Sequence, residues 1–336
     1  MEKKLYCGID VSKDKLDISL ALNDKEIITY AVFENSTAGC QKLFQWSKAR
    51  AKKLKIKQLH FCLEATGIYH EELADYLQEQ ENVIVSIVNP SQTKAFSECI
   101  MLRTKNDKVD SKMIAFYAAL KQPEQSAKPL EEIKKLRKLV RHLNYLVESR
   151  AHEKTRLTSL KDKELIQLTK ETISFYDEQI KKMEEMIKEH VDKYPGLKQD
   201  IKLLKTIPGI SDKTASEIIS EIYCMDISVK SQIAHAGLAP RERKSGSSIR
   251  GKSTICKKGN KKLRKSLYMP SLCAIRKNPL IKLFYERLVS KGKPKKVALI
   301  ASMRKLLSIA VSMLKNRQPF DITWAIKKQK ELSLAI

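Results

Sequence analysis

The sequence predicts an α/β domain at the N-terminus, then a pair of long helices, then a mostly helical and strongly basic C-terminal domain. Short apolar runs of strand length fill the first hundred residues, heptad spacing follows, and Lys and Arg then become abundant. The 336 residues are enough for two or three domains with cores of their own. We expect domains at 1–125, 126–195 and 196–325.

The first hundred residues alternate between strand and helix patterns. The pair Asn23-Asp24 supplies a turn between the second and third strands. Three antiparallel strands in a row, followed by alternating helices and strands, form the order expected of a ribonuclease-H-like fold. The expected strands are Leu5–Val11, Leu16–Leu22, Ile27–Phe33, Gln58–Glu64 and Val83–Val88, and the expected helices are Ala38–Lys53 and His70–Gln80.

Residues 131–192 are rich in Lys and Glu, and their apolar residues recur in steps of three and four. This spacing predicts two coiled-coil helices joined near Lys161–Thr172. The pair serves either as an oligomerisation seam or as a solvated linker. The apolar positions are Ile133, Leu136, Val140, Leu143 and Val147 in the first helix, and Ile173, Tyr176, Ile180, Met183 and Ile187 in the second.

A helix-hairpin-helix is predicted around the tight turn at Pro208-Gly209, with the second helix opening at Ser211-Asp212. Backbone N–H groups at such a turn can hold a phosphate, although many such turns are only structural. Further helices are expected at Asn260–Ile275, interrupted by Pro270, and at Val297–Leu314.

The net charge of +26, from 65 Lys and Arg against 39 Asp and Glu, predicts a polyanionic partner, by default nucleic acid. Residues 1–100 are nearly neutral, whereas residues 237–305 hold 21 Lys and Arg but only 2 Asp and Glu. The candidate nucleic-acid-binding residues are Arg103, Lys105, Arg241, Arg243, Lys244, Arg250, Lys257, Lys258, Lys261, Lys262 and Arg264.

The seven cysteines are scattered without a C-x-x-C pair, which is typical of reduced cytosolic proteins. The six histidines lack metal-ligand spacing. The N-terminus has no signal-peptide pattern, and no uninterrupted apolar run approaches the ~18 residues of a membrane span. These features predict a soluble, cytoplasmic protein of the cytosol or nucleoid, without a membrane partner.

Four carboxylates are the candidate catalytic residues. Asp10 and Glu64 end the first and fourth predicted strands, and Asp107 and Asp110 share one face of a helix through their i, i+3 spacing. Four carboxylates at one site repel each other unless divalent cations neutralise them, and two Mg²⁺ ions about 4 Å apart are usual in phosphoryl transfer. Mn²⁺ is the alternative ion. Taken singly, each acid has a simpler interpretation: Asp10 as a turn residue at the end of a strand, and Asp107 as an acid in the first turn of a helix, where the helix dipole stabilises it.

Six short motifs, in order, resemble those of the DEDD transposases, insertion-sequence recombinases related to the Piv DNA invertase. Their catalytic domain is similar to the RuvC Holliday-junction resolvase. The resemblance covers nearly the whole chain, and it carries the four acidic roles onto Asp10, Glu64, Asp107 and Asp110. The motifs are Gly8-Ile-Asp-Val-Ser-Lys13, Leu63-Glu-Ala-Thr-Gly67, Lys105-Asn-Asp-Lys-Val-Asp-Ser111, Gly237-Leu-Ala-Pro240, Lys244-Ser-Gly246 and Lys258-Gly-Asn-Lys-Lys-Leu-Arg264.

The resemblance also implies a nucleophilic serine, which the Ser-Gly motif places at Ser245. Cationic side chains crowd this serine in the sequence, and such groups stabilise charge on a pentacoordinate transition state. Ser247 and Ser248 remain alternative nucleophiles. Without the resemblance, the same segment is interpreted as a flexible basic loop whose hydroxyl groups contact phosphates.

The implied activity is transposition by DNA strand cleavage and exchange through a phosphoserine intermediate. The resemblance further implies a structured noncoding guide RNA, called a bridge RNA, double-stranded DNA from element ends and target, and a homodimer or homotetramer. Two alternatives stay open: a RuvC-like metal-dependent junction nuclease with water as nucleophile, and a non-catalytic nucleic-acid-binding protein. An actin-like sugar kinase or ATPase lacks support, because no later glycine-rich segment for adenosine is present.

Overall fold

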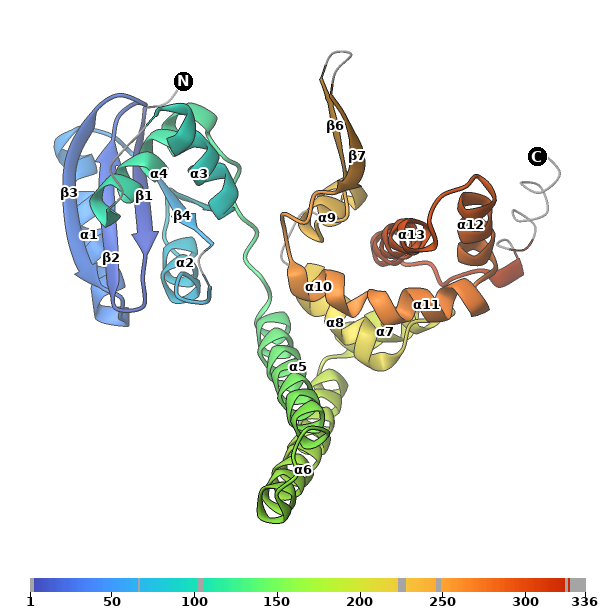
Figure 1. The fold of residues 1–336 in the computed structure, drawn as a ribbon. Coiled ribbons are helices and arrows are strands. Elements are labelled where there is room, and N and C mark those ends of the chain that lie inside the picture. The colour runs from blue at the N-terminus through green and yellow to red at the C-terminus, as the bar shows by residue number, and fades with distance from the viewer. Residues whose placement is uncertain are drawn as a thin grey trace. The chain divides into compact units, whose positions relative to one another are not determined.

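The computed structural model describes residues 3–65, 67–101, 106–222, 228–245, 249–323 and 326, and between 242 and 253 it describes the backbone alone. These residues form two compact units, residues 1–128 and residues 129–336, drawn in Figure 1. The first unit contains a mixed sheet, and the second is mainly helical.

The sheet of the N-terminal unit has the strand order β3-β2-β1-β4-β5. The first three strands pair antiparallel, and β4 and β5 extend the sheet in parallel with β1. This topology is consistent with the predicted ribonuclease-H-like fold. The strands are β1 (Lys4–Val11), β2 (Lys15–Ala21), β3 (Ile27–Glu34), β4 (Gln58–Glu64) and β5 (Val83–Val88).

Helices cover both faces of this sheet, and alternate residues of each strand face opposite cores. On β1, Leu5, Cys7 and Ile9 share one core with α1 and α2, whereas Tyr6 belongs to a second core with α4 and α3 (Figure 1). Side chains that follow Tyr6 by an even number of residues therefore lie on the α4 face. The helices are α1 (Thr37–Lys53), α2 (Glu71–Gln78), α3 (Pro90–Cys99) and α4 (Asp107–Lys121).

Helix α4 packs directly onto β1 at Gly8. A Cβ atom built on Gly8 would lie 2.1 Å from the backbone N of Ala115 and 2.4 Å from the backbone O of Ser111. Both contacts are with backbone, which has no flexible end that moves aside. Glycine at this position therefore sets the distance between the sheet and the N-terminal half of α4.

We expect Gly8→Ala to destabilise the N-terminal unit by more than about 2 kcal/mol, because the new methyl group pushes α4 away from the sheet. The thermal melting midpoint measures this loss. Gly196→Ala is the matched control, since a Cβ there meets no atom within 4 Å. Equal melting midpoints for the two variants would contradict the tight packing at Gly8.

His60 on β4 is a buried, neutral histidine. Its Nε2 lies 2.8 Å from the Ser86 hydroxyl, and that hydroxyl donates toward the backbone carbonyls of Pro123 and Glu124. The Ser86 oxygen therefore accepts the His60 Nε2–H. Burial, with a smaller contribution from the Lys4 charge, lowers the pKa of His60 to about 4.

This low pKa predicts a loss of stability in acid. Between pH 6.5 and 4 the unfolded chain binds a proton at His60 that the folded chain does not, so stability falls as the pH decreases through this range. The contribution at pH 4.5 is on the order of 2 kcal/mol. Urea denaturation at pH 7 and pH 4.5 should show a smaller acid-induced loss for His60→Gln than for the wild type; an equal loss would contradict this role.

The C-terminal unit is built on one hydrophobic core that includes residues of the helical pair and of the helices after it. A two-stranded antiparallel hairpin of β6 (Pro240–Ser245) and β7 (Ile249–Ile255) projects from this unit (Figure 1). The helices are α5 (Glu131–Leu157), α6 (Lys163–Lys193), α7 (Pro195–Lys205), α8 (Asp212–Ile222), α9 (Val229–His235), α10 (Lys261–Ser266), α11 (Tyr268–Lys277), α12 (Pro279–Ser290) and α13 (Lys295–Asn316).

Helices α5 and α6 are the two predicted long helices and contact each other, but they join earlier than the expected Lys161–Thr172. Helix α6 begins at Lys163, because the Asp162 carboxylate accepts hydrogen bonds from the backbone N–H groups of Glu164 and Leu165. The heptad positions of the first helix are buried from Ile133 to Leu143.

The turn between α7 and α8 contacts α11. Gly209 has a φ of +108°, and a Cβ there would lie 2.9 Å from the Cβ of Ala274. Ile207 and Ile210, on either side of Pro208-Gly209, are buried. Part of this turn is thus held against the protein's own core.

Two features of the C-terminal unit differ from the predicted elements. The expected helix Asn260–Ile275 is broken at Leu267, before Pro270, and the proline lies in the first turn of α11, where a missing N–H costs nothing. The hairpin of β6 (Pro240–Ser245) and β7 (Ile249–Ile255) was not predicted.

Helix α13 is long and apolar enough to cross a membrane, and it is the single such helix among the residues that the structure describes. Ser302, Leu306, Leu307 and Ala310 are fully buried in the protein. Packing in the core of the C-terminal unit accounts for its composition.

Candidate active site

The sheet places Asp10 and Glu64 next to each other. Strands β1 and β4 run parallel, and Ile9 pairs with Leu63, so the next residue of each strand is one of the two acids. Both lie on the α4 face of the sheet, because Tyr6 on β1 and Cys62 on β4 belong to the core with α4.

Asp107 and Asp110 lie in the first turn of α4. The Asn106 side chain fixes this turn by accepting a hydrogen bond of 2.9 Å from the backbone N–H of Val109. Ser111 follows Asp110 directly, and its hydroxyl is 2.9 Å from the Ser19 hydroxyl of β2. The helix start is thus tied to the sheet face that carries Asp10.

The electrostatics of Asp10 reflect this arrangement. Burial, together with the negative charges of Asp110, Asp107, Glu64 and Asp17, raises the pKa of Asp10 to about 6. The Thr93 hydroxyl of α3 donates a hydrogen bond of 2.7 Å to Glu64. The charges of Glu64, Asp107 and Asp110 therefore all act on Asp10.

The chemistry of these groups fits a divalent cation, which prefers carboxylate oxygens and whose charge would offset their mutual repulsion. Within the described ranges, no three His, Cys, Asp or Glu side chains converge closely enough to hold a metal ion. The agreement between these residues and a divalent cation thus rests on their carboxylate oxygens and on the raised pKa of Asp10.

A fifth carboxylate, Asp17, belongs to this region and was missed in the sequence. Asp17 lies directly opposite Asp10 in the β1–β2 register and is 4% exposed. Its Oδ1 accepts a short hydrogen bond from the Tyr30 hydroxyl. The alternation of β2 could have revealed it in the sequence, because Asp17 stands between the core residues Leu16 and Ile18 and so faces the opposite side of the sheet.

The second candidate region is the β6–β7 hairpin, which carries Ser245. Ser245 is the last residue of β6, and it pairs with Ile249 at the start of β7. The backbone thus presents Ser245 at the far end of the hairpin from its base. Ser247, Ser248, Arg103 and Lys105 lie outside the described residues.

A buried carboxylate, Glu221 of α8, fixes the base of this hairpin. Glu221 accepts hydrogen bonds of 2.9 and 3.0 Å from the Arg141 guanidinium of α5, and one of 2.6 Å from the Asn260 side-chain amide. Burial raises the pKa of Glu221, but the bond and charge of Arg141 outweigh it and hold this pKa below the ordinary value. Glu221 therefore stays ionised and joins three segments of the unit.

Asn260 connects this carboxylate to the chain leaving the hairpin. Its Oδ1 caps α10 by accepting from the backbone N–H groups of Lys262 and Leu263. Its backbone N–H donates to the carbonyl of His235 at 2.5 Å. A Cβ on the preceding Gly259 would lie 2.2 Å from that same carbonyl oxygen. The Gly-Asn pair is thus required by close packing of two backbones.

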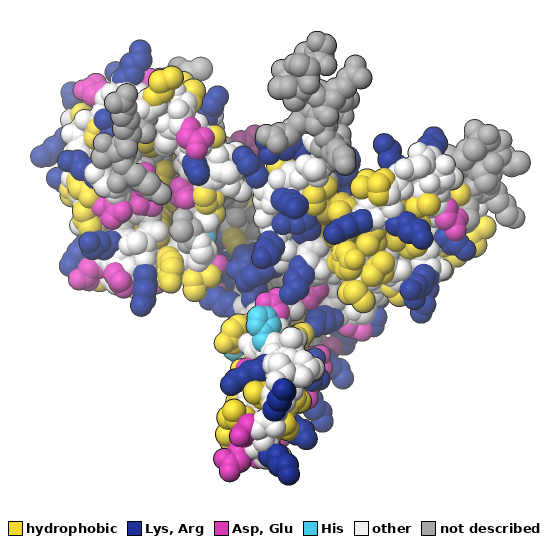
Figure 2. All heavy atoms as spheres, viewed as in Figure 1, with side chains coloured by type: hydrophobic (Ala, Val, Ile, Leu, Met, Phe, Trp, Pro, Cys, Tyr) yellow, Lys and Arg dark blue, Asp and Glu magenta, His cyan; other side chains and the backbone are white. Residues whose placement is uncertain are grey.

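The predicted nucleic-acid-binding residues divide into two groups. Arg264 donates a hydrogen bond of 2.8 Å to the backbone carbonyl of Ala236, so its guanidinium also holds the hairpin base. Figure 2 shows Lys and Arg side chains over much of the visible face of the C-terminal unit, interrupted by an apolar patch. The exposed members of the predicted set are Arg241, Lys257, Lys258, Lys261 and Lys262; for Arg243, Lys244 and Arg250 the backbone alone is described.

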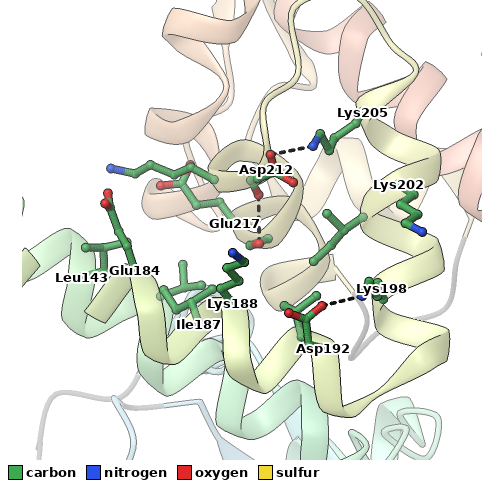
Figure 3. A pocket seen from close by; sticks show the side chains of 15 residues that line it. Leu143, Glu184, Ile187, Lys188, Asp192, Lys198, Lys202, Lys205, Asp212 and Glu217 are labelled. Atoms are coloured by element: carbon green, nitrogen blue, oxygen red, sulfur yellow. Dashed lines mark hydrogen bonds and ion pairs between the residues drawn. The ribbon is translucent and has the colours of Figure 1, made fainter. Parts of the chain in front are cut away.

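A cavity of about 580 Å³ lies elsewhere, between the helical pair and α7–α8. Figure 3 shows lysines and acids around its rim, with ion pairs of 2.7 Å joining Lys198 to Asp192 and Lys205 to Asp212. Because its charges are largely balanced, this cavity does not resemble a phosphate site.

A mixed sheet with acids at the ends of its central strand β1 and of the neighbouring strand β4 is consistent with the ribonuclease-H-like class. The family model of a DEDD transposase matches residues 7–163, and that of the Transposase IS116/IS110/IS902 family matches residues 201–286. The chain belongs to this transposase family.

Similar proteins agree with this assignment, two of them over nearly their whole length. The chain is 33% identical to the pilin gene-inverting protein of Moraxella bovis over 328 residues, covering 95% of this chain and 98% of that protein. The protein of the same name from Moraxella lacunata is 32% identical over 327 residues, with the same coverage. An uncharacterised protein of insertion element IS110 from Streptomyces coelicolor is 27% identical over 118 residues, which are 34% of this chain and 28% of that protein.

We expect Asn260→Ala to destabilise the C-terminal unit by roughly 2–4 kcal/mol, because it removes both a helix cap and a hydrogen bond to a buried carboxylate. Asn278→Ala is the matched control: Asn278 caps α12, and its buried amide nitrogen has no hydrogen-bond partner among the described residues. Its loss should cost about 1 kcal/mol. Equal losses in urea denaturation would argue against the Glu221 contact.

Proposed function

We propose that this protein is a transposase and site-specific DNA recombinase that uses a divalent cation and a serine nucleophile. The adjacency of Asp10 and Glu64 on one sheet face, with Asp107 and Asp110 in the first turn of the helix on that face, carries this proposal. Membership in the transposase family and full-length similarity to two pilin gene-inverting proteins support recombination as the outcome.

The four carboxylates are proposed to hold one or two divalent cations, with Mg²⁺ expected and Mn²⁺ as the alternative. A bound cation would supply Lewis-acid activation of an oxygen nucleophile and stabilisation of the leaving oxygen. The chain's own contribution is the fixed spacing of these acids: the register of β1 and β4 sets Asp10 against Glu64, and the capped start of α4 adds the other two.

Ser245 is proposed to attack a DNA phosphodiester. The Ser245 hydroxyl loses its proton as the Oγ–phosphorus bond forms and the bond to one deoxyribose oxygen breaks, and a proton is taken up by that oxygen, which leaves as a hydroxyl. A hydroxyl of another strand then attacks the phosphoserine, releasing Ser245 and rejoining DNA without an external energy source. The Arg and Lys residues beside Ser245 in the sequence suit the charge on this transition state.

The further partners are proposals as well. Exposed lysines at 257, 258, 261 and 262 are suited to phosphate contacts with DNA or with a structured guide RNA. The α5–α6 pair, proposed as a coiled coil, is suited to a dimer or tetramer seam. The α7–α8 turn is the proposed helix-hairpin-helix. Part of this turn packs on α11, so only its exposed backbone N–H groups are available to contact a phosphate.

The two alternative functions make different demands on the chain. A junction nuclease that uses water needs the four carboxylates but not Ser245. A binding protein without catalysis needs neither. Variants of Asp10 and Ser245 therefore separate the three functions.

The test uses the full chain, copurified with its nucleic acid, on plasmid DNA that carries its gene and flanking sequences. We expect Mg²⁺-dependent strand exchange and a covalent protein–DNA adduct on denaturing gels. Ser245→Ala should bind DNA as the wild type does but lose the adduct by a factor of at least about 10³. Asp10→Asn should lose both activities.

Ser247→Ala and Ser248→Ala are the matched controls and should retain the adduct. An undiminished adduct in Ser245→Ala moves the nucleophile to a neighbouring serine. Strand cleavage that persists in Ser245→Ala without an adduct favours the water-dependent nuclease. Sequencing of any RNA that copurifies tests the guide RNA, and its absence from an active preparation would rule that partner out.

A further inference from the structure

Asp17 stands in a position that needs an explanation beyond the fold. It is directly opposite Asp10 across the antiparallel β1–β2 pair, on the same sheet face. Opposed residues of this kind have Cβ atoms about 5 Å apart, and like charges there are destabilising. An apolar residue would avoid this cost.

No Lys, Arg or His side chain of the described residues forms an ion pair with Asp17. Its hydrogen-bond donor is the Tyr30 hydroxyl of β3, which donates to Oδ1. This hydrogen bond comes from a neutral donor, so it leaves the negative charge of Asp17 without a cationic partner among the described residues. The side chain is nonetheless 4% exposed, which removes most of the compensation available from water.

Tyr30 is itself held in place from α4. The Lys108 Nζ lies 5.2 Å from the centre of the Tyr30 ring, and Lys108 is the residue between the proposed cation-binding acid Asp107 and Val109. Burial, followed by the hydrogen bond to Asp17, raises the pKa of Tyr30 to about 12, so this hydroxyl remains a donor. Tyr30 of β3 thus contacts both β2, through Asp17, and α4, through Lys108.

We propose that Asp17 is an additional anionic group of the cation site at Asp10, and that Tyr30 is the positioning residue that holds its carboxylate there. The negative charge of Asp17 strengthens cation binding next to Asp10, and the cation in turn offsets the repulsion between the two acids. This inference rests on the proposed metal-dependent function.

The test is Mn²⁺ binding to the full-length chain after EDTA treatment and desalting, with free Mn²⁺ followed by electron paramagnetic resonance. Asp17→Asn keeps the acceptor for Tyr30 but removes the charge. It should weaken Mn²⁺ binding about tenfold. The melting midpoint of the metal-free protein should rise by a few degrees, because the repulsion with Asp10 is gone.

Two variants serve as controls. Asp24→Asn removes the same charge in the β2–β3 turn, beyond the other end of β2 from Asp17, and should leave Mn²⁺ binding unchanged. Tyr30→Phe keeps the Asp17 charge and should weaken binding less than Asp17→Asn does. An equal or larger loss in Tyr30→Phe would trace the effect to the hydrogen bond and overturn the role of the charge.

A purely structural Asp17 gives a different result. Mn²⁺ binding would then be the same in Asp17→Asn and the wild type, and the metal-free variant would melt no higher, which overturns this inference alone. Absence of Mn²⁺ binding in the wild type at millimolar concentration overturns it together with the metal-dependent function.

Discussion

The close packing of α4 on β1 is the contact on which the proposed catalytic site depends. At Gly8 the two backbones approach so closely that no side chain fits between them. The same helix brings Asp107 and Asp110 to the sheet, and the same strand ends with Asp10. A helix packed further away would leave two pairs of acids without a common site.

This proximity has an electrostatic cost, seen in the raised pKa of Asp10. Burial and four neighbouring carboxylates all disfavour the charged form. A fold that keeps such acids together is understandable when a divalent cation binds among them, because the repulsion becomes attraction to a shared ligand. Asp17 adds to this cost and so strengthens the case for a cation.

In the C-terminal unit, residues of the basic motifs have architectural roles beside any contact with nucleic acid. Gly259 and Asn260 fit against the His235 backbone, Asn260 reaches buried Glu221, and Arg264 binds a carbonyl of the same loop. The exposed lysines between these residues remain available for phosphates. The basic motif that follows the Ser245 hairpin therefore combines a rigid base with a charged surface.

The sequence by itself determined most of the strand and helix order, since alternating and heptad patterns are local and survive in the structure from β1 to α6. Family motifs supplied the four acids and Ser245, whose roles stay proposals. Only the tertiary structure decided that Asp17 faces Asp10, that Asn260 binds Glu221, and that residues 240–255 form a hairpin. These three features depend on strand register and on contacts between segments that are distant in the sequence. A short polar or basic stretch has no apolar periodicity from which such contacts could be predicted.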